Sequence, residues 1–183
     1  MKHIPNLITA LRLMLVPVVW KLMWDGVYDT ALAIGVFATA SDAVDGWIAR
    51  KLQATSKIGA ILDPIADKLL VAGTYVILWH RQEIPGWLVG IIIGRDVLIL
   101  LSAAIAYWLT PIRDFPPSRW GKLSTFIQII TLLVILVNRS GKILMYDVEH
   151  WMVLLCAAVT VWSGVHYLWL GINRLHAADR IAQ

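Results

Sequence analysis

The sequence predicts an all-α integral membrane protein with six transmembrane helices. Hydrophobic residues make up 59% of the 183 residues and charged residues only 15%, with a mean hydropathy of +0.71. Soluble domains contain about 45–50% apolar and about 25% charged residues. Six stretches also reach the length, about 20 mainly apolar residues, that a helix needs to cross a bilayer. The ten Trp residues are typical of membrane–water interfaces.

The spans follow one another through short connections that leave no room for a second domain. We therefore expect residues 1–183 to form a single membrane domain. The first span contains Arg12 and is followed by no small-residue cleavage site, which argues against a signal peptide. The predicted spans are Leu7–Trp24, Thr30–Ala49, Ile58–His80, Gly86–Thr110, Leu123–Asn138 and Val148–Ile172.

The distribution of Lys and Arg predicts the orientation of the spans. Four of these residues lie on one side of the membrane, and nine lie on the other. The nine are Lys2, Arg50, Lys51, Lys57, Arg113, Arg119, Lys122, Arg174 and Arg180. By the positive-inside rule both termini are cytoplasmic, and we expect a multi-pass protein of a bacterial inner membrane. The formal charge of +4 fits this topology and anionic lipid headgroups, and we expect no nucleic-acid partner.

Five acidic residues fall inside predicted spans, although each Asp at a helix centre costs about 2.5–3.5 kcal/mol on insertion scales. Asp42 and Asp45 are three residues apart in the second span, and Asp63 and Asp67 are four apart in the third. Each pair therefore lies on one helix face. Asp96 is the fifth such residue and lies deeper, in the fourth span.

The first four of these carboxylates are expected at one depth, close to the cytoplasmic face. Asp45 and Asp63 each lie about 7–8 Å from the cytoplasmic end of their span. At 5 Å and an effective dielectric constant of 20, one pair of such charges repels by about 3 kcal/mol. Divalent cations relieve this repulsion, and ligation by oxygen alone suits Mg²⁺ or Mn²⁺. The alternative is that the acids cap helices or pair with nearby Lys and Arg residues.

The residues around the four acids form a longer pattern. Asp42–Arg50 and Gly59–Asp67 match D-x2-D-G-x2-A-R-x8-G-x3-D-x3-D, with every fixed position and gap present. This is the signature of the CDP-alcohol phosphotransferase (CDP-alcohol phosphatidyltransferase) family, which the chain also resembles in length and number of spans. Within the family, the sequence is most similar to CMP-forming cardiolipin synthases and phosphatidylglycerophosphate synthases.

The resemblance implies a metal-dependent transfer of a phosphatidyl group from CDP-diacylglycerol to a glycerol-type acceptor, with release of CMP, at a site near the cytoplasmic face. It implies that two divalent cations, Mg²⁺ or Mn²⁺, are held by Asp42, Asp45, Asp63 and Asp67, and that Asp67 is also the general base. The residues implied in binding the cytidine diphosphate are Asp42, Asp45, Gly46, Ala49, Arg50 and Gly59. A homodimer is common among such relatives.

The acceptor depends on the remaining basic residues. Arg95 lies in the middle of the fourth span, where it must face a cavity or a partner. Adjacent side chains of a helix point about 100° apart, so we do not expect a simple ion pair between Arg95 and Asp96. Arg119 and Lys122 are three residues apart at the start of the fifth span, where they are candidates to bind a phosphate. The alternatives are a helix-locking polar network for Arg95 and positive-inside anchoring for the other two.

Family comparison favours one acceptor narrowly. Phosphatidylglycerophosphate synthases commonly carry a further Arg two turns after the Arg of the fourth span, and Gly-Lys-x-Lys-Thr before the fifth. Here Ser102 and Ser124 take those cationic positions. Fewer cations favour the singly charged phosphate diester of phosphatidylglycerol, which would make the chain a cardiolipin synthase, over glycerol 3-phosphate. Inositol-phosphate and amino-alcohol acceptors fit the resemblance less well but remain open. Two other classes of protein also remain open, an intramembrane prenyltransferase and a divalent-cation transporter.

Overall fold

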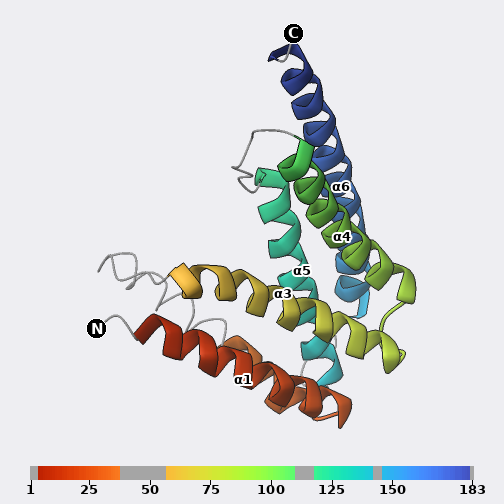
Figure 1. Ribbon diagram of the computed structural model, residues 1–183. Coiled ribbons are helices and arrows are strands. Elements are labelled where there is room, and N and C mark those ends of the chain that lie inside the picture. The colour runs from red at the N-terminus through yellow and green to blue at the C-terminus, as the bar shows by residue number, and fades with distance from the viewer. Residues whose placement is uncertain (1–3, 38–56, 110–117, 142–145, 182–183) are drawn as a thin grey trace. The chain divides into compact units, whose positions relative to one another are not determined.

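The chain is all-helical in the residues that the computed structural model describes, which are 4–37, 57–109, 118–141 and 146–181 (Figure 1). A further helical segment, Tyr28–Phe37, follows the first helix. The labelled helices are α1 Ile4–Trp24, α3 Lys57–His80, α4 Gly86–Leu109, α5 Arg119–Arg139 and α6 Tyr146–Ile181. The helix class predicted from the sequence is thus confirmed for this part of the chain.

Helix bounds agree with the predicted spans for α3 and α4. α1 begins three residues before the predicted Leu7, and α5 begins four residues before the predicted Leu123. α3 and α4 begin and end within one residue of the prediction. α6 continues past the predicted end at Ile172 to Ile181, and its 36 residues make it about 54 Å long at 1.5 Å per residue. Because a bilayer core is about 30 Å thick, α6 is longer than a single crossing needs.

Two helices in the described ranges are long and apolar enough to cross a membrane, namely α5 and the Tyr146–Asn173 part of α6. Large apolar side chains are exposed along them, among them Phe126 on α5 and Trp162 and Trp169 on α6. Exposed apolar surface of this extent is typical of contact with lipid or another protein. These features fit a membrane protein, and the six-span topology remains a prediction.

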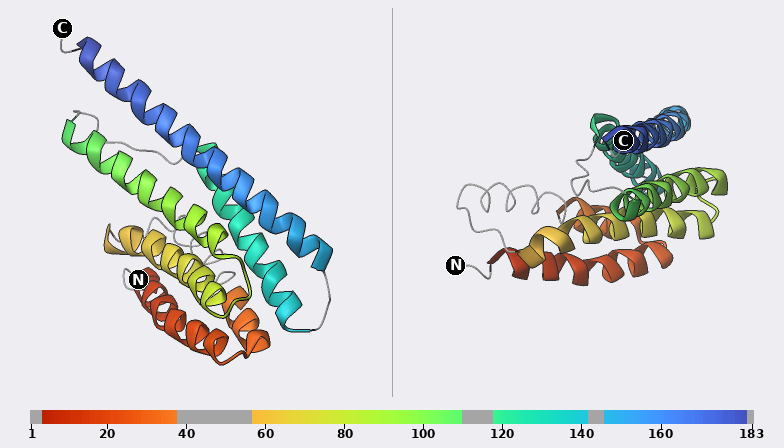
Figure 2. Two further views of the ribbon diagram at one scale, coloured as in Figure 1. Left: turned by 90° about the vertical axis from the view of Figure 1, so that its right-hand side faces the viewer. Right: turned by 45° about the horizontal axis from the view of Figure 1, so that its top comes forward.

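The chain divides into two compact units. The first contains residues 1–84 and 135–145, and α1 and α3 lie side by side in it (Figures 1 and 2). The ring of Trp20 on α1 packs directly over Gly73 on α3. Met23, Tyr75 and Leu78 are fully buried. Gly73 allows this approach because it has no Cβ atom.

A polar cluster made of Tyr28, Arg81, Glu83 and Arg139 ties together three segments of the first unit. The hydroxyl of Tyr28 donates to Glu83 Oε1 at 3.0 Å, and Arg81 Nε donates to that hydroxyl at 3.0 Å. Arg139 Nε donates to Glu83 Oε2 at 2.5 Å, and its Nη2 donates to the carbonyl of Glu83 at 2.9 Å. Arg81 also donates to the carbonyl of Trp24, the last residue of α1. The sequence placed Arg81 and Arg139 on one side of the membrane but did not predict that Tyr28 and Glu83 link them.

The second unit contains residues 85–134 and 146–183, and α4 and α6 lie side by side in it (Figure 2). Leu88, Ile92 and Cys156 are among its buried residues. Between α5 and α6, the hydroxyls of Ser124 and Thr160 share a hydrogen bond of 3.1 Å. Such hydrogen bonds between small polar side chains are a common means of joining helices in membranes.

Candidate active site

The predicted metal ligands divide between the described and undescribed parts of the chain. Asp63 and Asp67 lie on α3 four residues apart, so the backbone places them on one face of the helix, with Gly59 one turn before Asp63. The structure describes the backbone of these residues and not their side chains. Asp42, Asp45, Gly46, Ala49 and Arg50 lie outside the described residues.

Among the residues whose placement is described, no group of three or more His, Cys, Asp or Glu side chains could hold a metal ion. We therefore judge from their chemistry alone whether the four carboxylates of the signature suit a metal ion. Four carboxylates offer oxygen ligands alone, the kind that Mg²⁺ and Mn²⁺ prefer. The residue types fit these ions.

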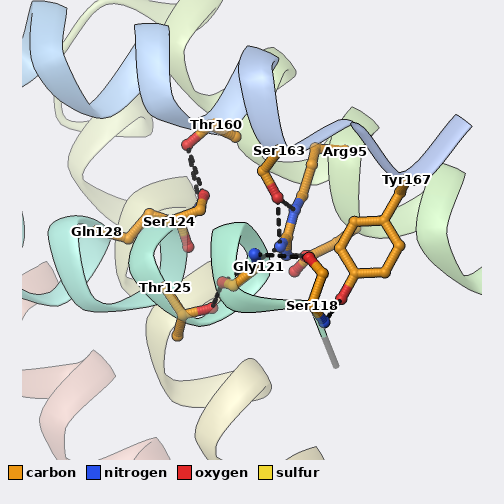
Figure 3. Close-up of polar contacts among 10 residues, drawn as sticks. Arg95, Ser118, Gly121, Ser124, Thr125, Gln128, Thr160, Ser163 and Tyr167 are labelled. Atoms are coloured by element: carbon orange, nitrogen blue, oxygen red, sulfur yellow. Dashed lines mark hydrogen bonds and ion pairs between the residues drawn. The ribbon is translucent and has the colours of Figure 1, made fainter. Parts of the chain in front are cut away.

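The guanidinium of Arg95 lies at the centre of a polar network in the second unit (Figure 3). Only 7% of this residue is exposed. Its Nε and Nη2 atoms donate to Ser163 Oγ of α6 at 3.3 and 3.0 Å, and Nη2 also donates to the carbonyl of Gly121 on α5 at 3.4 Å. The guanidinium carbon is 5.7 Å from the centre of the Tyr167 ring, a distance at which a cation is attracted to the face of an aromatic ring. Arg95 thus joins α4 to both α5 and α6.

The expectation that Arg95 and Asp96 would not pair is wrong. Arg95 Nη1 donates to Asp96 Oδ1 at 2.7 Å, and the Asp96 side chain is 21% exposed. The directions of adjacent Cβ atoms do differ on a helix, but the flexible stem of Arg is long enough for its guanidinium to return to the neighbouring carboxylate. α4 therefore contains a compensated charge pair rather than a lone cation.

The first turn of α5 brings the acceptor candidates near one another. Ser118 precedes the helix, and its Oγ accepts a hydrogen bond from the Gly121 N–H at 3.0 Å, as an N-cap residue does. The Arg95 guanidinium reaches the carbonyl of Gly121, which follows Arg119 by two residues and directly precedes Lys122. Arg119 and Lys122 are exposed. Their predicted role in binding the acceptor remains a prediction.

Gly121 is the position where this arrangement is tightest. A Cβ atom there would lie 2.7 Å from the Tyr167 hydroxyl oxygen and 3.2 Å from Arg95 Nη2. Tyr167 in turn accepts a hydrogen bond from the Ser118 N–H at 2.9 Å. Ser163 and Tyr167 were not among the residues predicted from the sequence, although two polar residues four apart in an apolar segment were an available signal.

The sequence matches a known protein family over most of its length. The profile of the family described as CDP-alcohol phosphatidyltransferase matches residues 2–162. The chain belongs to this family and is therefore an enzyme that transfers phosphatidyl groups, rather than a cation transporter or a prenyltransferase.

The individual relatives carry two kinds of name. A Pseudomonas fluorescens protein named "CDP-diacylglycerol--glycerol-3-phosphate 3-phosphatidyltransferase" is 33% identical over 176 residues, which cover 91% of this chain and 88% of that protein. A Rickettsia typhi protein of the same name is 31% identical over 176 residues, 91% of this chain and 96% of that protein. A Drosophila melanogaster protein named "Probable cardiolipin synthase (CMP-forming)" is 30% identical over 145 residues, 70% of this chain and 45% of that protein.

Proposed function

We propose that this chain transfers the phosphatidyl group of CDP-diacylglycerol to a hydroxyl of phosphatidylglycerol, forming cardiolipin and CMP. The observation that carries the transfer reaction is the complete signature over Asp42–Arg50 and Gly59–Asp67. Asp63 and Asp67 share a face of α3, as that signature requires. The choice of acceptor rests on a separate argument from charge.

Four carboxylates would hold the two divalent cations of the proposed site, those of Asp42, Asp45, Asp63 and Asp67. When bound, Mg²⁺ or Mn²⁺ would neutralise charge on the pyrophosphate of the donor. Gly46 and Gly59 would let the nucleotide approach the backbone closely, and Ala49 is a small neighbour of that pocket. Arg50 would offer its planar guanidinium to a phosphate of the cytidine diphosphate.

Asp67 would act as the general base, taking the proton of the acceptor hydroxyl on a carboxylate oxygen. The acceptor oxygen then forms a bond to the lipid-linked phosphorus, and the bond from that phosphorus to the oxygen of CMP breaks. General bases of this kind contribute about 10²–10⁴-fold to the rate. Asp63, one helical turn before Asp67, would serve only as a ligand of the metal ions.

The charges of the described residues support a singly charged acceptor. Arg95 is already paired with Asp96 at 2.7 Å, so the pair adds little net charge for a phosphate. Ser124, at the position where phosphatidylglycerophosphate synthases carry a second Lys, is buried against Thr160 of α6. Arg119 and Lys122 are the exposed cations of this turn. A phosphate diester such as phosphatidylglycerol needs fewer cations than the doubly charged monoester of glycerol 3-phosphate.

Glycerol 3-phosphate is the second candidate acceptor. The names of the Pseudomonas and Rickettsia relatives support it, because these proteins align with 91% of this chain. The Drosophila relative named for cardiolipin synthesis aligns with 70%. The charges of the described residues and the names of the relatives thus favour different acceptors, so the lipid product is the deciding measurement.

We place the reaction in a bacterial inner membrane, catalysed by a single six-span domain that covers residues 1–183 and has both termini in the cytoplasm. The excess of Lys and Arg in alternate connections supports this orientation. The two long apolar helices of the described part support membrane insertion. We expect a homodimer, as is common in this family.

The deciding experiment supplies purified protein in detergent with CDP-diacylglycerol and Mg²⁺ or Mn²⁺, and offers phosphatidylglycerol and glycerol 3-phosphate separately. We expect CMP release and cardiolipin with phosphatidylglycerol. Product from glycerol 3-phosphate alone would replace the proposed acceptor with the second candidate. No CMP with either acceptor would reject glycerol-type acceptors altogether.

The role of Asp67 is tested with Asp67→Asn. This variant should insert into membranes and bind CDP-diacylglycerol but lose about 10²–10⁴-fold in turnover, because the amide cannot take the proton. Asp147→Asn, which changes an acidic residue in the first turn of α6 outside the proposed site, is the matched control and should turn over normally. Normal turnover of the Asp67 variant would exclude this residue as the base.

A further inference from the structure

The donors of the Arg95 guanidinium are almost all used within the protein. A guanidinium has five N–H donors, one on Nε and two on each terminal nitrogen. Nε and one hydrogen of Nη2 go to Ser163, the other hydrogen of Nη2 goes to Gly121, and one hydrogen of Nη1 goes to Asp96. Among the residues that the structure describes, the second hydrogen of Nη1 is the one left without a protein partner. Arg95 can therefore offer a ligand oxygen a single N–H.

Two residues of α6 hold that guanidinium from one helix face. Ser163 and Tyr167 are four residues apart, so their side chains project from the same side of α6. Ser163 is fully buried and accepts two of the Arg95 hydrogen bonds. The ring of Tyr167 lies 5.7 Å from the guanidinium carbon, and its hydroxyl accepts the N–H of Ser118 (Figure 3).

The same two side chains therefore hold both parts of the acceptor turn, which we define as Arg95 of α4 together with residues 118–122, the N-cap and first turn of α5. Ser163 sets the rotation of the guanidinium, and Tyr167 sets the position of the N-cap residue Ser118. We propose that Ser163 and Tyr167 are positioning residues that align Arg95 with the turn bearing Arg119 and Lys122, and so determine how well the acceptor phosphate is captured. This inference rests on the proposed function, because it requires the acceptor to bind at this turn.

A purely structural role for these residues makes a different prediction. Thr160 is also buried on α6 and also bonds to α5, through Ser124 and Gln128, but it bonds neither Arg95 nor Ser118. If the α6 hydroxyls serve only to join helices, loss of the Thr160 hydroxyl and of the Ser163 hydroxyl should have the same effect. If Ser163 positions the acceptor turn, only its loss should change acceptor capture.

The test measures KM for the acceptor, KM for CDP-diacylglycerol and kcat separately. Ser163→Ala should raise the acceptor KM by about tenfold or more, because it removes the acceptor of two hydrogen bonds from a charged group. Its KM for CDP-diacylglycerol should change less than about twofold, a difference worth only a few tenths of a kcal/mol. Ser163→Thr, which keeps a hydroxyl, should have an acceptor KM close to that of the wild type. Tyr167→Phe keeps the ring but not the hydroxyl, and should raise the acceptor KM by a smaller factor.

Thr160→Val is the control and should leave the acceptor KM unchanged. Equal changes in both KM values for Ser163→Ala, or an equal rise in acceptor KM for Thr160→Val, would overturn the inference. A wild-type protein that releases no CMP with either acceptor would instead reject the proposed function. The two failures are distinguishable, because missing CMP release is measured on the wild-type protein and the changes in KM are measured on the variants.

Discussion

A methyl group added at Gly73 of α3 has no space in the packing against α1. A Cβ atom there would overlap Cζ2 and Cε2 of the Trp20 ring and lie 2.9 Å from Cη2. Carbon atoms in contact are about 3.5–4.0 Å apart, so the ring or the helix must move by about 1 Å or more. Overpacking of this kind costs about 1–3 kcal/mol, and occasionally more. Gly73→Ala should therefore lower the free energy of unfolding by about that amount, although Ala is the better helix former.

The measurement is denaturant unfolding in detergent micelles, followed by the far-ultraviolet circular dichroism of the helices. Gly90→Ala is the control, because nothing lies within 4 Å of a Cβ atom at that glycine, and it should not destabilise the protein. Trp20→Leu should relieve the overlap, so that the double variant is more stable than the sum of the single effects predicts. Trp20 Nε1 has no hydrogen-bond partner in the described structure, so this change breaks no hydrogen bond. Equal stability of Gly73→Ala and the wild type would refute this packing of α1 on α3.

Three further predictions concern other contacts. Gly121→Ala should raise the acceptor KM by displacing the Tyr167 hydroxyl, which a Cβ atom would approach to 2.7 Å, and an unchanged acceptor KM would contradict this. Glu83→Gln should lower the free energy of unfolding in detergent by about 1–3 kcal/mol. Lys21→Ala is the control and should change this free energy by less than about 1 kcal/mol, because Lys21 and Asp25 form an exposed ion pair. Equal effects of the two variants would count against the polar cluster. Burial and then the hydrogen bond to Glu83 raise the pKa of Tyr28 above its ordinary value of 10.0. The stability difference between wild type and Tyr28→Phe should thus be constant below about pH 10 and shrink as the pH rises through the raised pKa, and a difference that shrinks below pH 9 would contradict the assignment.

The helices of the described part were predictable because their cause is local. A run of about 20 apolar residues must satisfy its own backbone hydrogen bonds in lipid, and a helix does so within the segment. α3 and α4 accordingly begin and end within one residue of the predicted spans. The extension of α6 to Ile181 was not predicted, because residues after Ile172 include polar ones that carry no hydropathy signal.

Some features of the candidate site were likewise predictable from the sequence, and others were not. Asp63 and Asp67 were placed on one helix face from their spacing alone, since helical periodicity depends only on sequence separation. The partners of Arg95 were not predictable, because Ser163 and Tyr167 lie far along the chain and meet it only when α4 and α6 pack. The pair with Asp96 was predicted wrongly, because Cβ directions do not limit a side chain as flexible as Arg.

The sequence by itself indicated an apolar, membrane environment for the protein, its helical class and its family. Hydropathy, periodicity and a spaced motif are all properties of local sequence. Only the tertiary structure decided that Arg95 is compensated by Asp96 and held by α6 at the first turn of α5. It also decided that the Ser124 hydroxyl shares a hydrogen bond with Thr160 of α6. These facts depend on which helix faces meet. Packing and hydrogen bonds between helices distant in sequence decide this.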